Sequence, residues 1–226
     1  MLRKYKIQIL LIYYLVFMII LINLPITANI MIFIAKDNVI KASEYLTIIF
    51  YFSHFILFII GFLSFRGEIK IKLKDFALNW KKNLKYIAIG FISIIIANII
   101  VGMFIQQQGS NQETLSYMQQ GSAKLMLICF YLVTVIIGPI NEELIFRRIF
   151  IGEGRKYLSI FSVLILSSVI FGLIHIHNIK EIIVVIPYIC TGLILGFIYY
   201  KSDNVITSSL LHILNNLIGI IILAIA

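Results

Sequence analysis

Apolar stretches long enough to cross a membrane as helices recur along this sequence. A helical crossing takes roughly 20 apolar residues, about twice as many as a barrel strand. Of the 226 residues, 61% are hydrophobic and only 13% are charged, whereas about a quarter of a soluble domain is charged. The sequence therefore predicts an all-α polytopic transmembrane helix bundle, forming a single integral membrane domain over residues 1–226.

Proline and charge interrupt these stretches at a few places. Pro25 should break or kink the first span, with a continuation to residue 35 as the alternative, and Gly138-Pro139 should kink the fourth. The basic segment 66–85 predicts an interfacial amphipathic helix; a peptide-binding surface is the alternative. About seven spans are expected, at residues 7–24, 45–65, 84–105, 124–149, 160–177, 182–200 and 205–225.

The net charge of +9 comes from basic residues between the apolar stretches, which is how membrane topology is encoded. If the N-terminus is inside, all but four of the 19 Lys and Arg residues are cytoplasmic. The sequence thus predicts a multi-pass protein of the cell membrane with a cytoplasmic N-terminus and no nucleic-acid partner. Its aliphatic, Lys- and Asn-rich composition indicates a bacterial source.

Glu142 and Glu143 lie side by side within the fourth expected span. Ionisable residues inside a membrane are costly and by default indicate a functional site. Glu143 and Arg147 are four residues apart, so they share a helix face and can form a structural ion pair. Glu142 is rotated by about 100° from Glu143, which leaves it as the free carboxylate and the candidate general base.

Two further spans carry polar groups that could act with Glu142. His175, with Phe171 four residues before it, lies on the fifth expected span. His212 and Asn216, also four apart on the seventh, could donate hydrogen bonds to one oxyanion. Counting about 1.5 Å per residue from the expected cytoplasmic turns places all these polar groups near the middle of the hydrocarbon core.

Each group alone could be an interhelical hydrogen-bonding residue, but three sets at one depth favour a catalytic site. Glu142, His175 and His212 could also hold a catalytic zinc ion with one open position. There is no H-E-x-x-H motif, and an asparagine such as Asn216 is a poor zinc ligand. The sequence thus favours a glutamate-activated water with no cofactor required, and zinc as the alternative.

The three sets read E-E-x-x-x-R from Glu142, F-x-x-x-H from Phe171 and H-x-x-x-N from His212. In this order they resemble the CAAX protease and bacteriocin-processing enzyme family, or Abi-type intramembrane proteases. The Ras-converting CAAX endoprotease is similar at a greater distance. The resemblance places the catalytic core within residues 124–222.

This resemblance implies an intramembrane endopeptidase that hydrolyses a peptide bond. The positions implied to activate the water are Glu142 and His175, and those implied to stabilise the oxyanion are His212 and Asn216. The implied partner is a peptide or membrane-protein substrate within the bilayer, and relatives suggest peptide maturation or bacteriocin immunity.

Two other functions are consistent with a polar cluster in a membrane. A non-enzymatic membrane scaffold or immunity protein could use the same fold, although the intact set of polar residues argues against a dead site. A transporter would be expected to show inverted repeats, and none is evident. The sequence leaves the substrate and the oligomeric state open.

Overall fold

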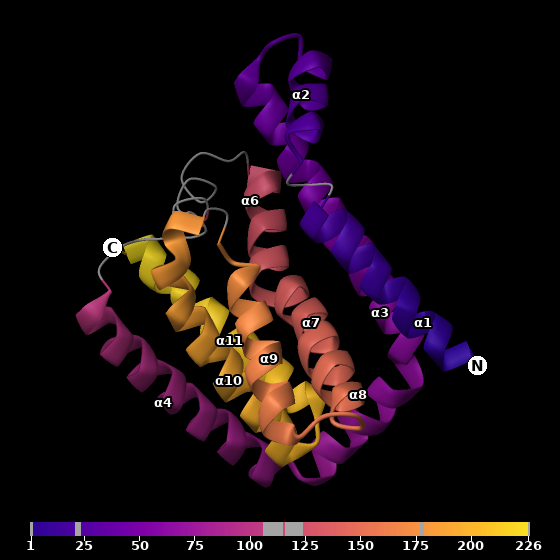
Figure 1. The fold of residues 1–226 in the computed structure, drawn as a ribbon, viewed down its shortest axis with the longest axis vertical. Coiled ribbons are helices and arrows are strands. Elements are labelled where there is room, and N and C mark those ends of the chain that lie inside the picture. Colours follow the sequence, from indigo (N-terminus) through magenta and orange to yellow (C-terminus); the bar gives the residue numbers. More distant parts are fainter. Residues whose placement is uncertain (1, 21–23, 106–114, 116–123, 177–178, 226) are drawn as a thin grey trace.

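The computed structural model describes residues 2–20, 24–105, 115, 124–176 and 179–225, and these form a bundle of helices (Figure 1). No β-strand occurs in these ranges, which confirms the predicted all-α class. In chain order the elements are α1 (Leu2–Tyr13), the π-helix η1 (Tyr14–Ile20), α2 (Pro25–Ile34), α3 (Val39–Leu78), α4 (Trp80–Phe104), α6 (Lys124–Tyr131), the π-helix η3 (Leu132–Ile137), α7 (Gly138–Glu142), the π-helix η4 (Glu143–Ile151), α8 (Gly152–Gly154), α9 (Ile160–Leu173), the 3₁₀-helix η5 (Ile179–Val184), α10 (Val185–Ser202) and α11 (Val205–Ile225).

Five helices in the described ranges are long and apolar enough to cross a membrane, and α1 with α2 makes a sixth if this pair, bent by 68°, counts as one crossing. The chain is therefore a multi-pass membrane protein. The expected count of seven is not confirmed, because α9 has only 14 residues. Residues 21–23 and 177, parts of two expected spans, lie outside the described residues.

The expected helix over 66–85 is divided between two longer helices. α3 continues to Leu78 and α4 begins at Trp80. No proline interrupts the sequence after the apolar part of α3, so the same helix runs on into the charged segment. It ends at Asn79, whose Nδ2 donates to Asp75 Oδ1 at 2.9 Å. The prediction of a separate helix was wrong in its boundaries.

The helix that carries the two glutamates runs without a break from Lys124 to Gly154. Its turns widen into π-helix on both sides of α7, a feature that is frequent at functional sites. The Gly138 amide donates to the carbonyl of Val133, five residues back, and a Cβ at position 138 would lie 2.9 Å from that oxygen. The close approach requires glycine, and the widened turns accommodate Pro139 within a continuous helix.

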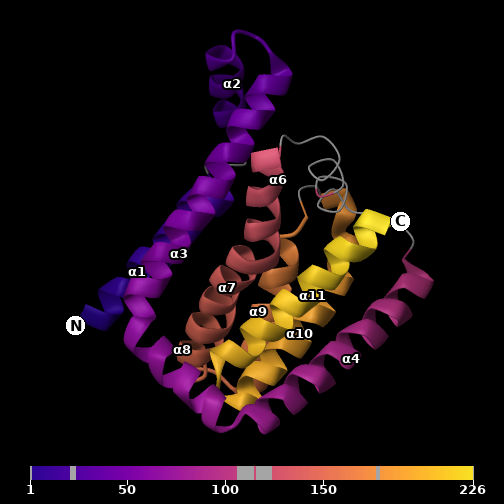
Figure 2. The same cartoon turned by 180° about the vertical axis from the view of Figure 1, so that it is seen from behind.

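α11 lies inside the bundle, where it contacts α3, α4, α10 and the segments η3, α7 and η4. α9 packs between η4 and α10, and α1 lies beside α3 in both views (Figures 1 and 2). A buried apolar cluster that includes Leu57, Phe146 and Phe171 joins these layers. The helices that carry the three motifs are therefore neighbours.

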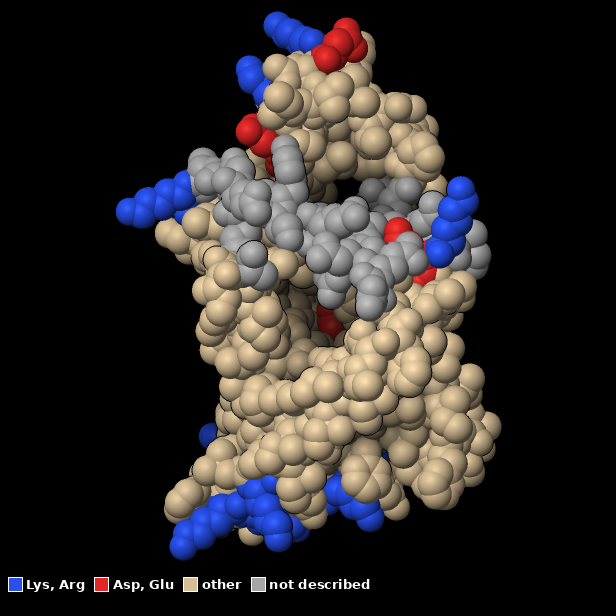
Figure 3. All heavy atoms as spheres, turned by 90° about the vertical axis from the view of Figure 1, so that its left-hand side faces the viewer, with Lys and Arg blue, Asp and Glu red and all other residues tan. Residues whose placement is uncertain are grey.

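Lys and Arg side chains gather at one end of the molecule (Figure 3). We call this the basic end; it comprises residues 66–85, 148, 153–159 and 201–204. Ion pairs hold its parts together. Arg148 binds Glu68 through two nitrogens and Glu153 through a third, the latter at 2.9 Å. Asp203 accepts from Lys72 at 3.0 Å and from Arg155 at 3.1 Å.

Asn204, which is fully buried, fixes the start of α11. Its Oδ1 accepts from the amide of Ile206 at 3.0 Å, as a helix cap does. Its Nδ2 donates to the carbonyl of Lys72 and to the carboxylate of Asp75, each at 2.9 Å. One side chain therefore joins α11 to the end of α3.

Candidate active site

His212 of α11 contacts both glutamates of the central helix. Its Nδ1 lies 3.1 Å from Glu143 Oε1, and its Nε2 lies 3.8 Å from Glu142 Oε2. The Glu143 side chain has no exposed surface, whereas that of Glu142 is 18% exposed. Glu142 is thus the carboxylate that a small molecule can reach.

The expected ion pair between Glu143 and Arg147 is present, with Oε1 and Nη2 3.3 Å apart and both side chains fully buried. The guanidinium lies over the ring of Phe171, 4.8 Å from its centroid. Within the described residues, neither the Arg147 nitrogens nor Glu143 Oε2 has a hydrogen-bond partner. Buried polar groups rarely stay without one, so these atoms are suited to bind internal water or a ligand.

The contact with Glu143 also orients the His212 imidazole. A carboxylate can only accept, so Nδ1 carries the proton that is donated to Glu143. Nε2 lies on the side of Glu142. It carries a lone pair in the neutral ring and a proton, which it can donate, in the doubly protonated ring. His212 can donate to an oxyanion from Nε2 only in the doubly protonated form.

His175 lies just beyond the end of α9, because that helix ends at Leu173 and not near residue 177 as expected. Its Nδ1 donates to the carbonyl of Phe171 at 2.6 Å, which satisfies a carbonyl left open at the helix end. The neutral ring then presents a lone pair at Nε2. The ring stacks on Tyr188 of α10 with centroids 4.5 Å apart.

Phe171 lies between the two histidine rings. Its centroid is 4.7 Å from that of His175 and 5.7 Å from that of His212. The fold thus brings the three motifs together around Phe171, whose ring contacts both imidazoles, while His212 also contacts the glutamates.

Asn216 joins α11 to the central helix. Its Nδ2 donates to the carbonyl of Thr134 in η3 at 3.0 Å. Because an amide nitrogen has two hydrogens, one N–H remains for a ligand. Sequence reasoning missed both Thr134, which takes part through its backbone, and Tyr188, which stands at no recognisable spacing from the motifs.

The residues considered for zinc do not form a metal site in this arrangement. Within the ranges that the structure describes, no three His, Cys, Asp or Glu side chains are grouped closely enough to hold a metal ion. The Nδ1 atoms of His175 and His212 are both already bonded to protein oxygens.

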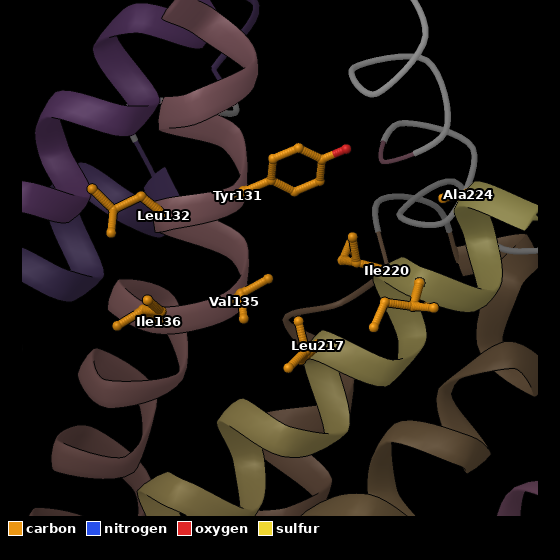
Figure 4. A pocket seen from close by; sticks show the side chains of 8 residues that line it. Tyr131, Leu132, Val135, Ile136, Leu217, Ile220 and Ala224 are labelled. Atoms are coloured by element: carbon orange, nitrogen blue, oxygen red, sulfur yellow. The ribbon is translucent and has the colours of Figure 1, made fainter.

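Two openings lie near these groups. Acidic atoms are visible at the bottom of a hollow about halfway along the molecule (Figure 3). An apolar groove of about 410 Å³ is lined by residues of α6, η3 and α11 (Figure 4). Its lining includes Val135 and Leu217, which directly follow Thr134 and Asn216 in the sequence.

Comparison with known proteins gives a match between residues 124–218 and the family described as type II CAAX prenyl endopeptidase Rce1-like. The matched segment contains all seven candidate site residues. No solved structure gives a significant match to the chain.

Three relatives extend the likeness beyond this segment. An uncharacterized protein of Mycoplasma capricolum is 30% identical over 74% of this chain and 52% of its own length. The membrane-embedded CAAX protease MroQ of Staphylococcus aureus is 27% identical over 66% and 64%. UPF0177 protein YxdF of Lactococcus lactis is 27% identical over 65% and 81%. The chain thus spans about half the length of the first of these relatives.

These matches confirm the resemblance indicated by the three motifs. They support a membrane peptidase, since a family of endopeptidases and a relative named as a protease share the segment that holds the motifs. Over residues 124–218, this chain resembles the type II CAAX prenyl endopeptidases of the Rce1-like family.

Proposed function

We propose that the chain is an intramembrane endopeptidase in which Glu142 activates the attacking water. One observation carries the proposal: a partly exposed carboxylate lies 3.8 Å from the imidazole of His212, at the level of a buried ion pair in a multi-pass membrane protein. The hydrocarbon layer disfavours such groups unless they serve a function, and a water-filled pocket would both hydrate them and supply the nucleophile.

In the proposed reaction, a water lies between Glu142 and His175. Glu142 takes one proton from it, and the lone pair at His175 Nε2 accepts a hydrogen bond from its other hydrogen. The oxygen attacks the carbonyl carbon of the peptide to form a tetrahedral oxyanion. The C–N bond then breaks, and Glu142 returns its proton to the leaving amine, so that one acid and one amine are released.

His212 and Asn216 are suited to stabilise the oxyanion. The contact with Glu143 orients the ring, so a doubly protonated His212 donates from Nε2 toward the space beside Glu142. Asn216 contributes the N–H that Thr134 does not use. Removal of one such donor typically lowers kcat about 10²- to 10³-fold.

The proposed setting is a bacterial cell membrane, with the basic end of the molecule and the N-terminus on the cytoplasmic side. The proposed substrate is a peptide or membrane protein, processed in peptide maturation or in immunity to bacteriocins. The relative MroQ, named as a membrane-embedded CAAX protease, supports cleavage within the membrane.

The proposal is tested by digesting a proteome-derived peptide library with the purified protein in lipid nanodiscs. New peptide ends are identified by mass spectrometry for the wild type, Glu142→Gln and His175→Ala. Loss of a general base should lower the rate of cleavage by about 10²- to 10⁴-fold. Glu44→Gln, at an exposed position outside the site, is the matched control and should cleave as the wild type does.

Cleavage that survives in both site variants would overturn the proposed roles, and a wild type that cleaves nothing would favour a scaffold or immunity protein. Treatment with a chelator examines the zinc alternative with the same assay. We expect no loss of cleavage; a loss that zinc restores would replace the metal-free mechanism.

A further inference from the structure

Tyr14, at the start of η1, brings a phenol to the site from outside the segment that matches the family. It is 8% exposed and belongs to the apolar cluster that includes Leu57, Phe146 and Phe171. None of the three motifs involves this part of the chain. The N-terminal helix is therefore in contact with the residues that surround the candidate active site.

A series of aromatic contacts connects Tyr14 to the histidines. The Tyr14 and Phe146 rings meet edge to face with centroids 6.0 Å apart, and Phe146 and Phe171 meet likewise at 5.4 Å. Phe171 in turn lies between the two imidazoles. Glu142 precedes Phe146 by four residues on the same helix, so Tyr14 packs against the face of that helix nearest to Glu142.

The polar end of Tyr14 lacks a partner. Its hydroxyl has no hydrogen bond to any residue that the structure describes, so it can donate to a nearby side chain or to water. Glu142 likewise has no hydrogen bond within the described chain, and its one charged contact is with His212 at 3.8 Å. A donor and an acceptor, both without a hydrogen-bond partner in the described chain, therefore lie on the same face of the central helix.

We propose that Tyr14 is a positioning residue for Glu142: its hydroxyl donates a hydrogen bond to the carboxylate, directly or through one water, and so fixes the direction in which the carboxylate faces. The contact itself is independent of what the protein does. Its consequence for catalysis rests on the proposed peptidase function.

The neighbouring tyrosine provides a matched control. Tyr13 is less buried, and its hydroxyl already donates to a protein carbonyl, that of Ser53, at 3.3 Å. Tyr13→Phe and Tyr14→Phe each remove one hydroxyl from the same helix and leave the ring in place. A general effect of losing a phenol should appear in both variants.

The first measurement is thermal unfolding in nanodiscs for Tyr14→Phe, Glu142→Ala and the double variant. Because a bond to a charged group is lost, Tyr14→Phe should lower Tm by roughly 3–6 °C in the wild type. It should have almost no effect once Glu142 is alanine. The corresponding set with Tyr13→Phe should be additive. Additive effects of Tyr14→Phe and Glu142→Ala would overturn the contact.

The second measurement uses the library peptide that the wild type cleaves fastest, resynthesised with a fluorophore and a quencher. Tyr14→Phe should lower kcat about tenfold and leave KM unchanged, whereas Tyr13→Phe should leave both unchanged. A wild-type kcat for Tyr14→Phe would overturn the positioning role while the peptidase stands. Absence of wild-type cleavage would overturn the peptidase, and the unfolding measurement would then decide the contact by itself.

Discussion

Arginine side chains have more hydrogen-bond partners at the basic end than in the centre of the bundle. At the basic end, Arg148 binds two carboxylates with three of its nitrogens. In the centre, the neighbouring Arg147 contacts one carboxylate, and none of its nitrogens has a hydrogen bond in the described chain. Of these two consecutive arginines, Arg148 thus has hydrogen-bond partners for its guanidinium nitrogens, and Arg147 has none in the described chain.

This difference separates a structural network from a candidate functional one. Groups near the ends of the spans can satisfy remaining hydrogen bonds with bulk water, whereas groups inside the hydrocarbon layer must satisfy them within the protein. Unsatisfied atoms in the centre therefore indicate bound water or a bound molecule. The comparison predicts that the central charges are the more sensitive to substitution.

The largest effect is expected from Arg147→Leu. It leaves the Glu143 carboxylate buried without its cation, and breaking a buried pair in this way costs about 3–5 kcal/mol. Thermal unfolding in nanodiscs should show a decrease in Tm of roughly 10 °C. A decrease no larger than that of Arg148→Ala would contradict the distinction between the centre and the basic end.

A smaller loss is expected from Arg148→Ala, since this side chain is 6% exposed but its acidic partners are accessible to water. Loss of hydrogen bonds between charged groups costs about 1.5–3 kcal/mol. Lys156→Ala, which removes an exposed partner of Glu153, is the control and should cost less than about 1 kcal/mol. If both variants lost the same stability, the ion pairs of Arg148 would contribute no more than an ordinary surface ion pair.

The smallest effect is expected at Asp203, whose side chain is 57% exposed. Its partial burial would raise the pKa, but the hydrogen bonds and charges of Lys72 and Arg155 outweigh this and hold the pKa below its usual value of 3.8. The stabilisation is therefore complete above about pH 4 and is lost as the pH falls through the lowered folded-state pKa.

Asp203→Asn should accordingly lower Tm slightly at pH 7, because the free energy of unfolding falls by at most about 1 kcal/mol. At pH 2 to 3 the variant and the wild type should converge. The two proteins are compared by thermal unfolding at both pH values. A difference that grows in acid would reverse the assigned direction of the pKa shift.

Much of the architecture could be predicted from the sequence because the bilayer permits few solutions. Long apolar stretches must form helices there, and a spacing of four residues correctly predicted the contact of Glu143 with Arg147. The contact of Glu142 with His212 agrees with the common depth obtained by counting the helical rise. Both predictions depend only on the regular spacing and rise of residues along a helix.

What could not be predicted depends on contacts between distant segments. α9 ends at Leu173, and the His175 side chain is hydrogen-bonded to its last turn. No proline or glycine directly beside His175 predicts this helix end. The helix break at Asn79 depends on its bond to Asp75. The packing of Tyr14 against Phe146 joins segments more than a hundred residues apart, for which no spacing rule exists.

The buried Asn204 determines more than the start of a helix. His212 follows it by eight residues, a rise of about 12 Å, so the height of the imidazole within the bilayer is determined at the aqueous boundary. Sliding α11 by one position would rotate that ring through about 100° and separate it from Glu143. Changes at the water-exposed rim, far from any reacting atom, can therefore abolish the alignment of the interior.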